Sequence, residues 1–256
     1  MTPQTIADLV SNGPADSVRV SVRPVVDTVK AMSEVRVVRR WSRNRVESRR
    51  AGPIVSPRAG GEVRLVAIGA STGGPPVLQT VLTGLPKPCP APIVIVQHIS
   101  AGFVQGLADW LTATTGMTVR LARHDDVAKA GFAYLAPDGC QMGITRDFRI
   151  MCGQEQAEHG LRPSASFLFR AVARHFGAHA VGVLLTGMGC DGAEDLKRMR
   201  DAGAVTLVQD KESSVVHGMP GEAIRLDAAT HVGNPERIAA MLHALLTPVP
   251  AKVIKS

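Results

Sequence analysis

The sequence predicts an α/β fold in which a doubly wound, mostly parallel sheet is flanked by helices and accompanied by a small antiparallel hairpin patch. Short, continuous apolar runs, typical of strands buried on both faces, alternate with segments of helical periodicity. This alternation implies right-handed crossovers between parallel strands. A chain of 256 residues is long enough to bury one large core.

Strands are predicted where an apolar run ends abruptly in glycine or in a polar residue. The buried strands are expected at residues 64–69, 92–97, 119–122, 180–186 and 204–208. Three more short strands are separated by the turn sequences Pro-Asp-Gly and Thr-Arg-Asp, so we expect them to form the antiparallel patch. They are expected at residues 133–136, 141–144 and 148–151.

Helices are predicted where apolar residues recur at helical spacing, and some of them have recognisable ends. Pro75 falls in the first turn of one helix, where its missing N–H costs little. Gly203 closes another helix. The predicted helices cover residues 75–85, 102–114, 164–176, 191–202, 218–226 and 235–246.

The net charge of +7 is concentrated near the N-terminus. Residues 1–60 carry 11 basic and 5 acidic side chains, whereas residues 61–256 carry 18 and 17. Residues 1–62 are therefore predicted to be a basic, mostly flexible arm, with a short amphipathic helix at 25–32. Residues 63–248 are predicted to be the folded domain, and 249–256 a tail. Without aromatic interleaving or a nucleic-acid motif, the arm is interpreted as a solvated linker and not as a nucleic-acid contact.

Composition also limits the compartment and the cofactors. No apolar run approaches the roughly 20 residues that span a bilayer, and the N-terminus has no secretory signal pattern. The four cysteines have no metal-ligand spacing, which favours reduced thiols. We therefore expect a cytoplasmic protein with no membrane insertion, no metal and no cofactor.

Three polar residues follow three of the predicted buried strands. Ser71 follows the strand at 64–69 in a turn rich in glycine, His98 follows the strand at 92–97, and Asp191 follows the strand at 180–186. The carboxyl ends of parallel strands share one edge of the sheet, where open α/β sheets bind ligands. Serine, histidine and aspartate brought together there could serve as nucleophile, general base and orienting carboxylate.

Other groups near these strand ends complete a predicted active site. The backbone N–H groups of Thr72 and Met188 are candidates for stabilising an oxyanion. Gly73, His217 and Met219 are candidate substrate contacts.

Each member of this set also has a structural interpretation. A lone serine in such a turn is commonly a helix cap or part of a phosphate cradle, and an aspartate that opens a helix is commonly an N-cap. Only the coincidence of all three residues favours catalysis. An anion- or nucleotide-binding module and an inactive adaptor that docks through the basic arm remain open alternatives. The order Ser, His, Asp also differs from that of α/β-hydrolases.

Several motifs resemble one known family. They are I-G-A-S-T-G-G at 68–74, Q-H at 97–98, R-P-S at 162–164, L-T-G-M-G-C-D-G-A at 185–193 and G-M-P-G-E-A at 218–223. In order and spacing they resemble the catalytic domain of the CheB family of chemotaxis protein-glutamate methylesterases, over about residues 63–246.

The resemblance implies a serine hydrolase that removes methyl esters from glutamate side chains on cytoplasmic helices of chemoreceptors, releasing methanol. It also implies deamidation of receptor glutamines as a further activity. Ser71, His98 and Asp191 match the family's catalytic triad, and Thr72 and Met188 match its oxyanion-side positions. No cofactor or metal is implied. The receptor helices are the expected partners, with a separate signalling protein as a candidate partner of the basic arm.

Two departures from the family pattern affect these expectations. The family usually carries a receiver domain before the esterase domain, and the first 62 residues lack a parallel-sheet pattern. We therefore expect no receiver domain and no phosphorylation switch. Cys190 stands where the family more often has Asn or Asp. It is interpreted as a buried, inert thiol, with tuning of the adjacent Asp191 as the alternative.

Overall fold

The computed structural model describes residues 62–247. The predicted arm, its short helix and the C-terminal tail lie outside the described residues.

A seven-stranded parallel sheet forms the centre of the described domain, in the order β3-β4-β2-β1-β7-β8-β9. Its central strands are apolar and buried on both faces, as predicted for a parallel sheet. The strands are β1 (Leu65–Ala70), β2 (Ile93–Gln97), β3 (Thr118–Leu121), β4 (Phe132–Leu135), β7 (Ala180–Leu184), β8 (Val205–Gln209) and β9 (His231–Gly233).

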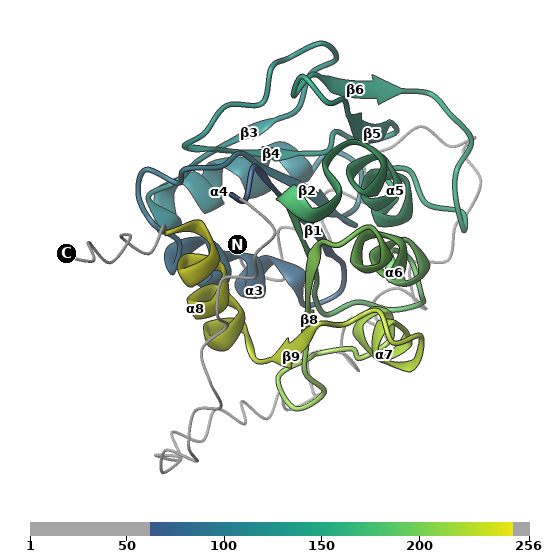
Figure 1. Ribbon diagram of the computed structural model, residues 1–256. Coiled ribbons are helices and arrows are strands. Elements are labelled where there is room, and N and C mark those ends of the chain that lie inside the picture. Colours follow the sequence, from purple (N-terminus) through teal and green to yellow (C-terminus); the bar gives the residue numbers. More distant parts are fainter. Residues whose placement is uncertain (1–61, 248–256) are drawn as a thin grey trace, which may run out of the picture. The chain divides into compact units, whose positions relative to one another are not determined.

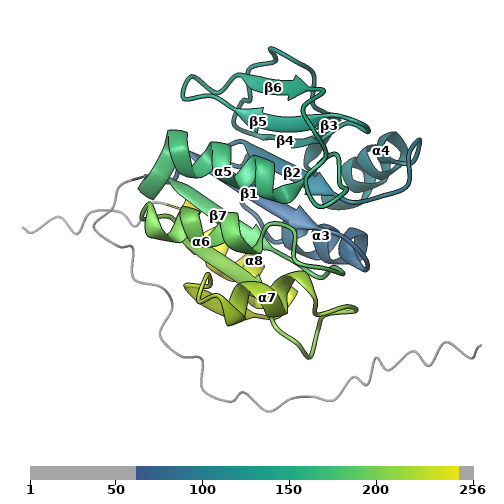
Figure 2. The ribbon, with the colours of Figure 1, turned by 90° about the vertical axis from the view of Figure 1, so that its right-hand side faces the viewer.

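Helices cover both faces of this sheet (Figure 1). One layer consists of α3 (Gly74–Thr83), α4 (Val104–Thr115) and α8 (Pro235–Leu246). The other consists of α5 (Ala165–Phe176), α6 (Ala193–Asp201) and α7 (Met219–Arg225), which lie side by side in Figure 2. A single 3₁₀ turn, Gly177–His179, connects α5 to β7. The predicted doubly wound α/β fold is confirmed.

A two-stranded antiparallel hairpin, β5 (Gln141–Ile144) and β6 (Ile150–Gly153), packs against α5. Residues 133–136 were predicted to join this patch, and that prediction was wrong because β4 pairs in parallel with β2 and β3. The turn at 137–139 therefore marks where the chain leaves the parallel sheet. The prediction also missed β9, since only one of its three residues is buried.

The order of the strands reverses at β1, since the chain continues to β2 on one side and later returns to β7 on the other. In doubly wound sheets, ligands bind outside the carboxyl ends of the strands at such a switch point. The loops that follow β1, β2 and β7 meet there, and they carry Ser71, His98 and Asp191. No described helix is long and apolar enough to cross a bilayer.

Candidate active site

Ser71 begins the turn between β1 and α3, and its backbone is held from both neighbouring strands. Its N–H donates to the carbonyl of Thr186, 3.0 Å away, just beyond β7. Its own carbonyl accepts from the side chain of Gln97 at 2.9 Å and from the N–H of Gly74 at 2.8 Å. The Ser71 side chain, partly exposed, lies over Gly187, where an added Cβ would be 2.7 Å from the serine Cβ.

His98 lies beside Ser71 because each residue directly follows the last paired residue of its strand, and one more hydrogen bond joins the two strands there. Ala70 pairs with Gln97, and the N–H of His98 donates to the carbonyl of Ala70 at 2.9 Å. The imidazole is only 12% exposed, and its Nε2 lies 2.9 Å from Oδ2 of Asp191. Since an ionised carboxylate only accepts hydrogen bonds, this contact places the ring proton on Nε2 and leaves Nδ1 with a free lone pair.

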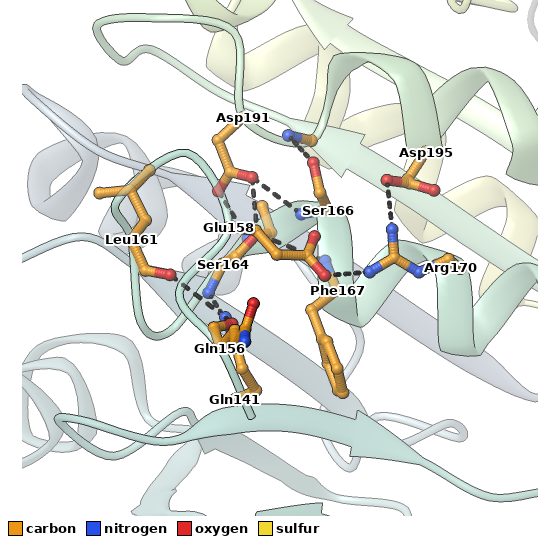
Figure 3. A network of polar contacts seen from close by, with 12 residues as sticks. Gln141, Gln156, Glu158, Leu161, Ser164, Ser166, Phe167, Arg170, Asp191 and Asp195 are labelled. Atoms are coloured by element: carbon orange, nitrogen blue, oxygen red, sulfur yellow. Dashed lines mark hydrogen bonds and ion pairs between the residues drawn. The ribbon is translucent and has the colours of Figure 1, made fainter. Parts of the chain in front are cut away.

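Asp191 is buried at the N-terminus of α5 (Figure 3). Its carboxylate accepts from the backbone N–H of Ala165 at 2.6 Å and of Ser166 at 3.1 Å, and from the hydroxyl of Ser164 at 2.7 Å. Ser164 is also the N-cap of α5. The first helical turn thus provides both free donors and the positive end of the helix dipole.

These contacts decide the charge of Asp191. Burial alone would raise the pKa of its carboxyl group, but the hydrogen bonds from His98, Ser164 and the N–H groups of Ala165 and Ser166 outweigh that effect. The pKa of Asp191 is lowered to about 2. The carboxylate is therefore ionised throughout the neutral range.

Asp191 was predicted to open a helix, but α6 begins two residues later at Ala193. Gly192 stands between them with a φ of 83°, a conformation that L side chains rarely adopt, and its N–H donates to Oγ of Ser166 at 2.8 Å. This turn frees Asp191 from its own helix and directs its carboxylate to the N-terminus of α5.

A second layer of polar contacts supports the N-cap of α5 (Figure 3). The fully buried Gln141 of β5 accepts the N–H of Ser164 at 2.9 Å and donates to the carbonyls of Gln156 and Leu161. Farther along α5, Arg170 pairs with Glu158 and, at 3.3 Å, with the buried Asp195 of α6. The antiparallel hairpin is thereby connected to Asp191 through Ser164.

The predicted oxyanion donors are free to bind a ligand. Among residues 62–247, neither the N–H of Thr72 nor that of Met188 has a hydrogen-bond acceptor. The carbonyl of Thr72 is held from behind by the hydroxyl of Thr186 at 2.9 Å. The Met188 side chain is 76% exposed in the loop that follows β7.

The three candidate substrate contacts lie around this loop. Gly73 caps α3 with a φ of 80°, and Val215 packs directly against it. His217 forms an isolated parallel bridge with Gly187, and its ring lies against Gly221 of α7. Met219 is fully buried and packs on Gly187. Met219 is thus placed to support the wall of the site from inside.

Cys190 was interpreted as a buried thiol, and that interpretation was wrong. Its side chain is exposed, because residues 188–190 protrude between the end of β7 and the buried Asp191. Within the described part of the chain, no group of three or more His, Cys, Asp or Glu side chains could hold a metal ion.

Comparison with known proteins identifies the family of this domain. Residues 66–242 match the model of the CheB methylesterase family. The chain belongs to the CheB methylesterase family. Its described fold also agrees with the crystal structure of the Thermotoga maritima CheB methylesterase catalytic domain. The TM-score is 0.69 and the identity 34%, over 72% of this chain and all of that one.

Curated relatives of this CheB-family chain bear a two-part enzyme name. A protein-glutamate methylesterase/protein-glutamine glutaminase of Geobacter metallireducens is 50% identical over 224 residues, and one of Nitrosospira multiformis is 49% identical over 228 residues. The matches cover 87% and 88% of this chain. They span 65% and 64% of the two relatives.

Of the residues predicted for the site of this CheB-family domain, the structure brings His98 and Asp191 into direct contact. It places Ser71 beside His98, at the position that follows the Ala70–Gln97 pair. The hydroxyl of Ser71 makes no hydrogen bond to His98 within residues 62–247. Sequence reasoning assigned no role to the buried polar residues Gln97, Gln141, Ser164, Ser166 and Thr186. The sequence feature that could have identified them is the position of a polar residue at the end of an apolar strand or at the start of a helix.

Proposed function

We propose that this protein is a serine hydrolase that removes methyl esters from glutamate side chains of chemoreceptors and releases methanol. The observation that carries the proposal is the contact between His98 Nε2 and the buried, ionised carboxylate of Asp191. His98 also lies beside Ser71, since both follow the Ala70–Gln97 pair. The names of the curated relatives support a methylated protein glutamate as the substrate, and the resemblance to chemotaxis methylesterases supports chemoreceptors as the proteins that carry it.

In the first half of this reaction, Oγ of Ser71 attacks the ester carbonyl while Nδ1 of His98 takes the hydroxyl proton. Nδ1 is the available nitrogen because Asp191 occupies Nε2. The N–H groups of Thr72 and Met188 are the donors for the oxyanion of the tetrahedral intermediate. When that intermediate collapses, His98 returns the proton to the methoxy oxygen, and methanol leaves.

In the second half, water attacks the resulting ester between Ser71 and the receptor glutamate. His98 takes a proton from the water and returns it to Oγ of Ser71, which frees a glutamate carboxylate. A glutamine side chain would form the same acyl-enzyme with ammonia as the leaving group. The glutaminase half of the relatives' name supports this second activity. Both substrates lie on cytoplasmic receptor helices, so we propose a cytoplasmic location.

The alternative of a phosphate cradle has little geometric support. In the first turn of α3, the N–H of Gly74 donates to the carbonyl of Ser71, and Pro75 and Pro76 have no N–H. Only Thr72 and Gly73 offer unused N–H groups in this turn, fewer than a phosphate-binding loop provides. A cradle would also not require the paired His98 and Asp191.

The proposed function is tested by methanol release from a methylated chemoreceptor. We expect release by the wild type and none by Ser71→Ala, with unchanged circular dichroism in the variant. Release at the wild-type rate by Ser71→Ala would refute the nucleophile assignment. Absence of release by the folded wild type would refute the methylesterase proposal.

A further inference from the structure

Gln97 is the last residue of β2 and is only 3% exposed. Its carboxamide nitrogen donates to the carbonyl of Ser71 at 2.9 Å and to the carbonyl of His98 at 2.8 Å. A primary amide nitrogen has two N–H groups, and both are used here. A single buried side chain therefore links the backbone of the proposed nucleophile to that of the proposed base.

The other end of this carboxamide is not satisfied. Oε1 of Gln97 is buried and has no hydrogen-bond partner among the described residues. An unpaired buried acceptor is destabilising, so the oxygen end of this side chain does not stabilise the fold. The contribution of the amide therefore lies in its two donors, which hold the carbonyls of Ser71 and His98.

The planar peptide bond shows what these donors can control. In a trans peptide, the carbonyl of one residue and the N–H of the next point in opposite directions. Holding the carbonyl of Ser71 in the interior therefore fixes the outward direction of the Thr72 N–H, the proposed oxyanion donor. The second hydrogen bond, to the carbonyl of His98, fixes the backbone of the base relative to that of Ser71, because both bonds come from one carboxamide nitrogen.

We propose that Gln97 is a positioning residue that sets the nucleophile, the oxyanion donor and the base relative to one another. This inference rests on the proposed function. Misplacement of reacting groups by about 1 Å costs on the order of 100-fold in rate. The role should thus be visible in kcat and not in KM, because Gln97 is buried beneath the turn and does not touch the substrate.

The first test replaces the carboxamide with an apolar side chain of similar shape, Gln97→Met. We expect kcat for methanol release to fall about 10- to 100-fold, with KM within about twofold of the wild type. Sulfonylation of Ser71 by phenylmethanesulfonyl fluoride should slow by a similar factor. Thr206→Val is the matched control. Thr206 is also fully buried, and its hydroxyl donates to the carbonyl of Ala228, away from the site.

The second test moves the carboxamide without changing it. A Cβ added at Gly74 would clash with Oε1 of Gln97, and the φ of Gly74 is not in the left-handed region. Gly74→Ala should therefore displace the flexible amide and lower kcat. Gly106→Ala in α4 is its control, since a Cβ there meets nothing within 4 Å. In a Gln97→Ala background the clash with the amide is absent and only the 3.0 Å approach to Ala70 Cβ remains, so Gly74→Ala should cost less additional activity than in the wild type.

The outcomes separate this inference from the proposed function. Unchanged kcat and unchanged sulfonylation in Gln97→Met and Gly74→Ala would overturn the positioning role, as would an equal loss in Thr206→Val. If the wild type releases no methanol but Ser71 is sulfonylated, the substrate proposal fails. The labelling rates of the variants then decide the role of Gln97. If the wild type neither releases methanol nor is sulfonylated at Ser71, the serine is not activated and both proposals fail.

Discussion

The imidazole of His98 and the carboxylate of Asp191 meet at 2.9 Å, and that carboxylate stands at the N-terminus of α5. Asp191 therefore serves two functions in the fold: it orients a histidine that follows β2, and it accepts free N–H groups of a helix. Substitutions at this position should affect both catalysis and stability, and the two effects can be measured separately.

Asp191→Asn should abolish most of the activity. An asparagine side chain can present an N–H to Nε2, which would favour the tautomer with the proton on Nδ1 and remove the lone pair that is proposed to take the proton of Ser71. We expect kcat to fall about 1,000- to 10,000-fold, as for comparable triads. The measurement is methanol release, with near-ultraviolet circular dichroism as the control for folding. A loss of less than tenfold in a folded variant would contradict the orienting role.

The pKa of Asp191 predicts how stability depends on pH. Burial raises this pKa, but the hydrogen bonds outweigh burial and lower it from 3.8 to about 2. The stabilisation is therefore fully present above about pH 4 and is lost as the pH falls towards 2. Its magnitude is about 2 kcal/mol, at 1.36 kcal/mol per pKa unit. The difference in unfolding free energy between the wild type and Asp191→Asn should shrink by about this amount from pH 5 to pH 2. A difference that stays constant with pH would show that Asp191 has the same pKa in the folded and the unfolded protein.

Ser164→Ala should weaken the support of Asp191 without removing its charge. The hydroxyl of Ser164 caps α5 and donates to Oδ1 of Asp191 at 2.7 Å, so its loss should cost about 1–2 kcal/mol in unfolding free energy. We expect a smaller loss of kcat than in Asp191→Asn, because two backbone N–H groups still hold the carboxylate. Ser100→Ala, on an exposed loop after β2, is a control for the loss of a hydroxyl. Equal stability in the two variants would contradict the capping role.

The parallel sheet and its strand-end residues could be predicted from the sequence because both follow local rules. An apolar run that ends at a polar residue shows in the sequence alone where a strand reaches the edge of the sheet that carries the site, as at Gln97–His98. The contacts that hold these residues could not be predicted in the same way. Ser164 and Asp191 are 27 residues apart, and only the packing of α5 against α6 brings them together. Likewise, the turn residues predicted that the antiparallel patch begins with β4, but β4 still belongs to the parallel sheet and the antiparallel hairpin begins with β5.

Met188 offers a way to separate the oxyanion donor from its side chain. The N–H has no acceptor within the described residues, and the side chain is 76% exposed. Met188→Ala keeps the N–H and should change kcat little, whereas Met188→Pro removes it and should lower kcat about 100- to 1,000-fold. Methanol release with both variants is the measurement. Similar kcat values in the two folded variants would exclude the Met188 N–H as a donor.

Gly192 and Gly189 form a matched pair in the loop that carries Asp191, since both have a φ of 83°. At Gly192 an added Cβ would lie 3.0 Å from Leu184 Cδ1 and 3.1 Å from Ala165 Cβ, whereas at Gly189 it would meet nothing within 4 Å. Gly189→Ala should therefore cost only the backbone strain, about 1 kcal/mol, with most activity retained. Gly192→Ala should cost about 1–3 kcal/mol more, because the chain must move away from α5. Since that movement displaces the neighbouring Asp191 from the N–H groups of α5, kcat should fall as well. Urea unfolding and methanol release on both variants test this, and equal effects at the two positions would show that close packing at Gly192 does not hold Asp191 in place.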